Sequence, residues 1–315
     1  MVPCATVCRD TTLLSRLAKI AAATCAALLT AALPAAASFP ADPTATARGR
    51  GVLVVAAGDI ACSADDKPTP SSCQQGATAQ LVRRIDPAAV LTLGDTQYEQ
   101  GELADYRTSY AKTWGKLRPR TYPVPGNHEY DTSGAAGYYH YFRNRQPGPH
   151  GWYSYRLGSW RLYALNSECD QVSCAVEEAW LRAQLRQRPG GCSLMYMHQP
   201  RFSSGKTHGD TPMVKGLWRV AYRHGVDVAL SGHEHNYERF GRLNQLGQTV
   251  ADGIASFVVG TGGKGLYPIG TLEPGSKAHY DDGFGVLALR LGRGSYGWRF
   301  QTIRGDVKDH GSSRC

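Results

Sequence analysis

Five short apolar runs, each followed at once by polar residues, constrain the fold of this chain more than any other feature of its 315 residues. Apolar runs of this length are typical of strands that are buried on both faces. The runs and their polar ends are GVLVVAA with Asp59, AAVLTL with Asp95, RTYPVP with Asn127 and His128, CSLMYM with His198, and VDVALS with His233 and His235. Because α/β sheets bind ligands at the carboxyl ends of their strands, the sequence predicts one site there.

The segments between these runs predict helices. Helical candidates cover residues 74–85, 101–116, 176–187 and 212–224. Residues 152–166 alternate in polarity and turn at Gly158-Ser159, which predicts a hairpin. The predicted architecture is therefore α/β, with strands sandwiched between helical layers.

The N-terminal stretch predicts a secretory signal peptide. A basic start through Lys19 precedes the apolar run 20–33, and an A-x-A type cleavage site follows, with cleavage after Ala37. A membrane anchor is the alternative, but the apolar run is short for a span. The predicted organisation is a signal peptide over 1–37, a linker over 38–50 and one catalytic domain over 51–315, secreted and without membrane attachment after cleavage.

Six cysteines remain after the leader, and an even number in an exported chain suggests disulfides. Local spacing favours the pairs Cys62–Cys73 and Cys169–Cys174, which leaves Cys192 and Cys315. The sequence does not prove this pairing. Since no CxxC pair occurs, a zinc site made of thiolates is not expected.

The formal net charge of +9 mildly favours anionic substrates. The sequence contains no run of like charges and no basic helix, so nucleic acid is not an expected partner.

The polar ends supply carboxylates and imidazoles, which suit borderline divalent or hard trivalent metal ions. His233 and His235 are two residues apart, so on an extended segment both rings point to the same side. Each motif alone is more often a turn or a buried histidine. Their occurrence together at five strand ends predicts a metal centre. Two metal ions about 3.5–4 Å apart can clamp the attacking and leaving oxygens of a phosphoryl group.

The order of these motifs (GD, GDxxY, GNHE, H and GHxH) resembles that of the calcineurin-like metallophosphoesterases. Tyr98 in GDTQY and the stretch SGHEHNYER resemble the purple acid phosphatase branch, in its compact bacterial form. The resemblance implies a four-layer αββα sandwich. It also implies hydrolysis of phosphate monoesters by in-line attack of a metal-bound hydroxide, without a phospho-enzyme intermediate.

The resemblance implies two metal ions, with Asp95 bridging them. The first, Fe(III) in the family, would take Asp59, Asp95, Tyr98 and His235. The second, Fe(II), Zn(II) or Mn(II), would take Asp95, Asn127, His198 and His233. Most of the superfamily has a histidine ligand where this chain has Ala61, and Tyr98 is interpreted as its substitute.

Several other residues are candidates for binding or catalysis. His128 resembles the family residue that holds the substrate phosphate, and His208 is the candidate general acid. The alternative for His208 is an exposed loop histidine. Arg201 and Lys206 could meet phosphate, although exposed bases are common, and Glu129 is a candidate for orienting a ligand.

Two other functions stay open at this point. A phosphodiesterase or nuclease could use the same two-metal site. A non-catalytic exported binding protein with a degenerate metal site is the third hypothesis, and the intact ligand set argues against it. The chain has no GxSxG elbow and no P-loop that would offer another chemistry. The oligomeric state and the natural substrate are not predicted.

Overall fold

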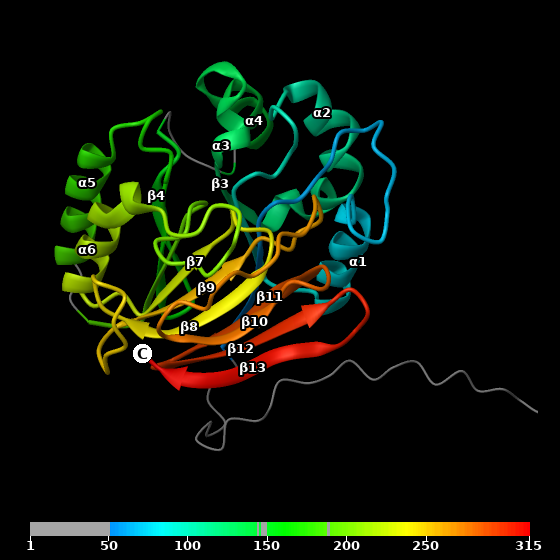
Figure 1. Ribbon diagram of the computed structural model, residues 1–315. Helices are drawn as coiled ribbons and strands as arrows, with labels where there is room; N and C mark the ends of the chain where they lie inside the picture. The colour runs from blue at the N-terminus through cyan, green and yellow to red at the C-terminus, as the bar shows by residue number, and fades with distance from the viewer. Residues whose placement is uncertain (1–50, 144, 146–149, 188–189) are drawn as a thin grey trace, which may run out of the picture. The chain divides into compact units, whose positions relative to one another are not determined.

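The computed structural model describes residues 51–143, 145, 150–187 and 190–315, and the predicted signal peptide and linker lie outside this part of the chain. Two sheets form the centre of the described fold (Figure 1). The first sheet has the order β13-β12-β11-β1-β2-β3, and the second has the order β10-β8-β9-β7-β6-β5-β4. Both sheets contain parallel and antiparallel pairs.

The predicted strands are confirmed. The first sheet contains β1 (Val52–Ala57), β2 (Ala89–Leu93), β3 (Thr121–Val124), β11 (Gly285–Gly292), β12 (Ser295–Thr302) and β13 (Val307–Arg314). The second sheet contains β4 (Tyr153–Leu157), β5 (Trp160–Ala164), β6 (Ser193–Tyr196), β7 (Val228–Ser231), β8 (Tyr237–Leu243), β9 (Ile254–Val259) and β10 (Ser276–Tyr280). The hairpin predicted at Gly158 joins β4 to β5.

Helices lie on both sides of the pair of sheets (Figure 1). They are α1 (Gln75–Ile85), α2 (Leu103–Thr108), α3 (Asn127–Tyr130), α4 (Ala136–Phe142), α5 (Cys174–Arg186) and α6 (Lys215–Arg223). Short 3-10 turns are η1 (Tyr110–Lys112), η2 (Trp114–Arg120), η3 (Ser133–Ala135) and η4 (Pro212–Val214). Helix α1 contacts β11 of the first sheet, and α5 packs on α6 beside the second.

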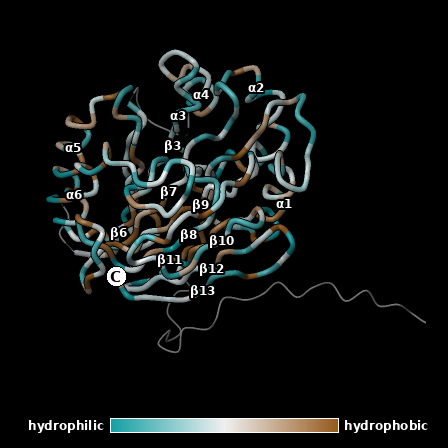
Figure 2. Tube along the Cα trace, in the orientation of Figure 1, coloured by the Kyte–Doolittle hydropathy of each residue, from teal (hydrophilic) through white to brown (hydrophobic). Residues whose placement is uncertain are grey.

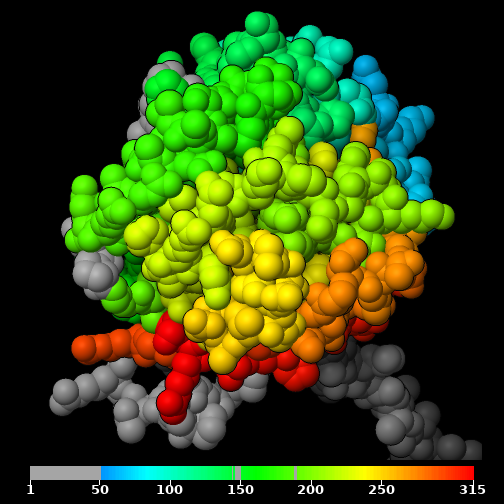
Figure 3. Space-filling view, turned by 60° about the vertical axis from the view of Figure 1, so that its left-hand side comes forward, coloured from blue at the N-terminus to red at the C-terminus, as the bar shows by residue number. Residues whose placement is uncertain are grey.

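The central strands β6, β7 and β9 of the second sheet are buried on both faces, which explains their uninterrupted apolar sequences. In β6, Leu194 and Tyr196 belong to the core between the sheets, whereas Met195 packs in the cluster that contains Leu181 of α5 and Trp218 of α6. Successive side chains of a strand point to opposite faces, so one strand serves two layers of packing. Figure 2 shows that the hydrophobic segments of the sheets lie inside the fold. Figure 3 shows the surface formed by the green and yellow part of the chain. The four-layer αββα sandwich is thus confirmed.

One predicted helix is wrong in its extent. The segment 101–116 does not form a single helix, because α2 ends at Thr108 and 3-10 turns continue the chain. The Tyr110 amide donates to the Gln97 side chain at 3.0 Å, and the Ser109 hydroxyl donates to the Cys62 carbonyl at 2.6 Å. These bonds to other loops replace the regular helical pattern.

The two cysteine pairs favoured by local spacing are present, Cys62–Cys73 and Cys169–Cys174, and the two remaining cysteines form the pair Cys192–Cys315. The third pair joins the residue before β6 to the residue after β13, and so it links the second sheet to the edge of the first. In the described part of the chain, no helix combines the length and the apolar character that crossing a membrane requires.

Candidate metal centre

The carboxyl ends of five strands meet at one site. Strands β1, β2 and β3 are parallel neighbours in the first sheet, and β6 and β7 are parallel neighbours in the second. The predicted ligands follow these strands: Asp59 after β1, Asp95 and Tyr98 after β2, Asn127 after β3, His198 after β6, and His233 and His235 after β7. The structure brings all seven side chains into one connected set of contacts.

Two motif glycines allow this close approach. A Cβ atom on Gly94, where φ is +80°, would lie 2.6 Å from atoms of the His198 ring. A Cβ atom on Gly126 would lie 2.3 Å from the Asp95 Oδ1 atom. Any larger residue would therefore push a predicted ligand out of place, which is the physical reason for glycine before the polar residues.

One group of donor atoms gathers around Tyr98. Its phenolic oxygen lies 3.0 Å from Asp59 Oδ1 and 3.1 Å from His235 Nε2. The same His235 nitrogen lies 3.3 Å from Asp59 Oδ1. All three side chains are buried. Ala61 contributes only its backbone here, because its carbonyl accepts from the Tyr98 amide at 2.8 Å, and the phenol supplies the side-chain oxygen.

A second group gathers around His198. Its Nε2 atom lies 3.1 Å from Asn127 Oδ1 and 3.1 Å from His233 Nδ1. The other ring nitrogen of His198 donates to the Leu93 carbonyl at 2.8 Å. This bond fixes the ring so that Nε2 faces the site, as is usual for metal-ligating histidines.

Asp95 lies between the two groups. Its Oδ2 atom is 2.9 Å from the Tyr98 phenol and 3.3 Å from His198 Nε2. Its Oδ1 atom accepts the His128 amide at 3.0 Å, which holds the carboxylate in this orientation. One oxygen of Asp95 is therefore shared by both groups of donors.

Three of the donor-bearing residues have left-handed backbones, with φ of 60° at Asp59, 46° at Asp95 and 69° at His233. Residues with side chains rarely adopt this conformation, and such strain concentrates at functional sites. Here the left-handed backbone turns the chain sharply after each of the three strands, so that the side chain faces the centre.

The electrostatics of these residues fit bound cations. Burial, and then the charges of Asp59 and Asp95, raise the pKa of the Tyr98 phenol well above its usual range. Burial, and then positive charge on His198, lower the pKa of His233 to about 2, so this ring is a neutral donor. Burial opposes ionisation of Asp95, but the neighbouring histidines outweigh it and hold its pKa below the usual range. Cations among these donors would favour the phenolate and offset the carboxylate charges.

Glu129 binds the backbone of the loops that carry the predicted ligands. Its buried carboxylate accepts the amides of Asp95 at 2.9 Å, Thr96 at 2.8 Å and Gly126 at 2.7 Å. These amides belong to the loops after β2 and β3. Glu129 therefore joins two ligand-bearing loops, and the sequence had suggested only that it orients a ligand.

The two predicted catalytic histidines lie on different sides of the centre. The His128 ring lies 4.3 Å from the Tyr98 ring, and its Nε2 atom lies 4.0 Å from Asp95 Oδ2. The exposed His208 ring stacks on His233 with 4.1 Å between centroids. Arg201 instead pairs with Asp210 at 3.5 Å. The Lys206 side chain is exposed.

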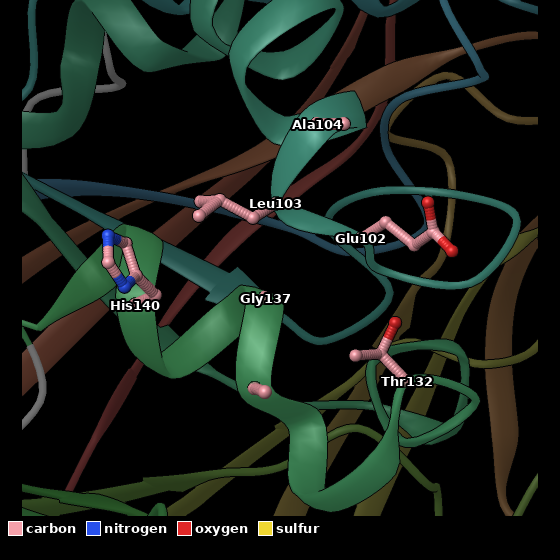
Figure 4. A pocket seen from close by; sticks show the side chains of 7 residues that line it. Glu102, Leu103, Ala104, Thr132, Gly137 and His140 are labelled. Atoms are coloured by element: carbon pink, nitrogen blue, oxygen red, sulfur yellow. The ribbon is translucent and has the colours of Figure 1, made fainter.

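Sequence reasoning missed two residues of the loop after β9. The Tyr267 ring stacks on His235 at 3.9 Å, and the Lys264 ammonium lies 4.9 Å from the centre of the Tyr98 ring. A surface hollow of about 420 Å³ between α2 and α4 is lined by other residues, among them Glu102, Thr132 and His140 (Figure 4).

Glu168 gives the fold a pH dependence that can be measured. Burial is the main reason that the pKa of this carboxyl rises from 4.5 to about 7. The folded protein therefore keeps a proton that the unfolded chain loses above its ordinary pKa, so stability falls as pH rises between these values. At about 1.4 kcal/mol per pKa unit, the loss amounts to about 3 kcal/mol.

We expect Glu168→Gln, which is neutral throughout, to lack this decline. Urea unfolding of the metal-free protein at pH 5 and pH 7.5 measures the change in the free energy of unfolding. Glu102→Gln, the same substitution at an exposed position, is the matched control. The Glu168→Gln variant should gain stability relative to wild type as pH rises. If the free energy of unfolding changed equally with pH in the wild type and in Glu168→Gln, the raised pKa of Glu168 would be contradicted.

Comparison with known proteins agrees with this arrangement. The model of the calcineurin-like phosphoesterase family matches residues 52–237. Purple acid phosphatase 1 of Ipomoea batatas is 25% identical over 52% of this chain and 39% of its own length. Fe(3+)-Zn(2+) purple acid phosphatase 12 of Arabidopsis thaliana is 26% identical over 53% of this chain and 40% of its own. This chain thus spans about two-fifths of these curated relatives.

The fold is shared with a solved purple acid phosphatase. PPD1 from yellow lupin superposes with a TM-score of 0.71 at 20% identity, covering 85% of this chain and 54% of that chain. GAP50, an anchor in the inner membrane complex of Plasmodium, superposes with a TM-score of 0.61 at 18% identity, covering 84% of this chain and 89% of that chain. The family model spans more than half of the chain and includes every strand end that carries the predicted donors, and so the chain belongs to the calcineurin-like phosphoesterase family.

Proposed function

We propose that this chain is a secreted, metal-dependent phosphatase that hydrolyses phosphate monoesters at a site for two metal ions. The observation that carries the proposal is the division of the donor atoms into two groups that share Asp95 Oδ2. The first group would hold Fe(III), because a phenolate such as Tyr98 is a hard, charged donor. The second would hold Fe(II), Zn(II) or Mn(II) through Asn127, His198 and His233.

Bound at these two positions, metal ions would polarise the phosphoryl oxygens and lower the pKa of a coordinated water. The chain itself supplies orientation and proton transfer. His128 has its Nδ1 atom against the Glu99 carbonyl, which accepts a hydrogen bond from it, so the protonated ring would donate to a phosphoryl oxygen through Nε2. His208 lies against His233, where a ring nitrogen can pass a proton to the leaving alkoxide.

Export is part of the proposal. The basic start, the apolar run 20–33 and the small residues before Ser38 support a cleaved signal peptide. Three disulfides in the described residues suit an oxidising compartment outside the cytoplasm.

A comparison of an aryl phosphate monoester with the corresponding diester tests the reaction. We expect kcat/KM to be at least about tenfold higher for the monoester, because it offers one more terminal oxygen than the diester to the two metal ions and to His128. Diester turnover that is faster by tenfold or more would favour the phosphodiesterase alternative. Absence of turnover of both by the metal-loaded protein would favour a binding protein.

A further inference from the structure

Glu234 stands between two predicted ligands, His233 and His235, but its carboxylate bonds the backbone of another segment. It is fully buried, and its Oε1 atom accepts the backbone amides of His208 and of Gly209, the latter at 2.7 Å. We propose that Glu234 is a positioning residue that holds the segment 203–210 so that His208 lies at the metal centre. This inference rests on the proposed function.

Other backbone bonds hold the segment before Thr207 and after Gly209, among them the bond from the Lys206 amide to the Pro268 carbonyl at 3.0 Å. The Ser203 amide donates to the Asp210 carboxylate at 2.9 Å, and the Ser204 amide donates to Glu238 at 2.8 Å. The side chains of Lys206, Thr207 and His208 are exposed. An exposed turn exchanges between conformations unless its backbone is bonded. The Glu234 carboxylate therefore restricts the turn at His208, the residue that carries the proposed general acid.

Close packing makes the contact specific. A Cβ atom on Gly205 would lie 2.1 Å from the Glu234 Cδ atom, so only glycine lets the segment pass over this side chain. Gly209, with φ of +69°, turns the chain directly after His208. The carboxylate is therefore enclosed by the segment that it bonds.

The position of the ring follows from this support. The His208 ring stacks on His233 at 4.1 Å and lies 5.7 Å from the Tyr267 ring. A general acid must stay within hydrogen-bond reach of the leaving oxygen, and a displacement of about 1 Å can cost about a hundredfold in rate. Glu234 acts on the reaction through His208 and touches no reacting atom.

A matched pair of variants distinguishes the effect of the hydrogen-bond acceptor of Glu234 from the effect of its side-chain volume. Glu234→Gln keeps an oxygen that accepts both amides, whereas Glu234→Leu fills the space without an acceptor. Amide hydrogen exchange at His208 and Gly209 should be at least about tenfold faster in Glu234→Leu and close to wild type in Glu234→Gln. Equal protection in Glu234→Leu and wild type would overturn the proposal, whether or not the protein is active.

A double-mutant cycle with His208→Ala tests the route of action. Glu234→Leu should lower kcat by about a hundredfold for an alkyl phosphate and by less for an aryl phosphate, because the poorer leaving group needs the acid more. In the His208→Ala background the same change should cost less than about threefold. Full additivity of the two changes would overturn the proposal.

Metal content distinguishes this role from support of the adjacent ligands. Glu234→Leu should keep the metal content of the wild type, and loss of metal would make Glu234 a support of His233 and His235 instead. A wild-type protein that binds metal but hydrolyses no phosphate ester would contradict the proposed function. The exchange measurement would then still decide whether Glu234 holds the segment.

Discussion

Asp95→Ala is expected to abolish hydrolysis, with kcat/KM at least about a thousandfold lower, because both metal positions lose the shared oxygen. The same change should empty both positions, since Asp95 Oδ2 lies within 3.3 Å of donors from either group. Metal content by elemental analysis and turnover of an aryl phosphate, measured on the same preparation, check both effects.

Asp252→Ala is the matched control, because Asp252 is exposed in the turn between β8 and β9. It should keep full activity and metal content. Activity of Asp95→Ala within about tenfold of wild type would show that Asp95 is not the bridging residue. Loss of activity with both metal ions retained would place Asp95 in catalysis rather than in binding.

Tyr98→Phe is expected to remove the visible absorption of the oxidised protein. The band in a phenolate–Fe(III) centre arises from charge transfer between the oxygen and the metal, so it requires the oxygen that this change deletes. Asp59 and Asp95 would also lose a buried neighbour within 3.0 Å, and we expect metal affinity to fall by at least about tenfold.

Tyr106→Phe is the control for this spectrum. Tyr106 is also buried, but its hydroxyl bonds to Glu129 at 2.9 Å rather than to the donor atoms. Its variant should keep the colour of the wild type. A band that survives in Tyr98→Phe, or a colourless active wild type with two zinc or manganese ions, would remove Tyr98 from the proposed ligands.

The sequence predicted the strands and the shared location of the seven donor residues, because both follow from local patterns. A buried strand needs an apolar run, and Gly94 and Gly126 are needed where a Cβ atom would strike His198 or Asp95. Spacing also favoured two of the cysteine pairs, and the two remaining cysteines form the third.

Contacts between distant segments could not be predicted in the same way. The stacking of Tyr267 on His235 and the bonds from Glu234 to His208 and Gly209 depend on how loops cross in space. The end of α2 at Thr108 has the same origin, since the Tyr110 amide is bonded to Gln97 of a neighbouring loop. No periodicity in the sequence records such bonds.

The fold by itself does not establish catalysis. Probable inactive purple acid phosphatase 9 of Arabidopsis thaliana is 24% identical over 62% of this chain and 36% of its own length, and GAP50, described as an anchor, has the same architecture. The arrangement of the donor atoms must therefore be tested directly.

A crystal structure of the purified wild-type protein with anomalous diffraction data would test the account most directly. The account predicts two metal peaks about 3.5–4 Å apart, one beside Asp59, Tyr98 and His235 and the other beside Asn127, His198 and His233. Asp95 should contact both. A single peak, or two peaks with the Tyr98 oxygen turned away from both, would contradict it.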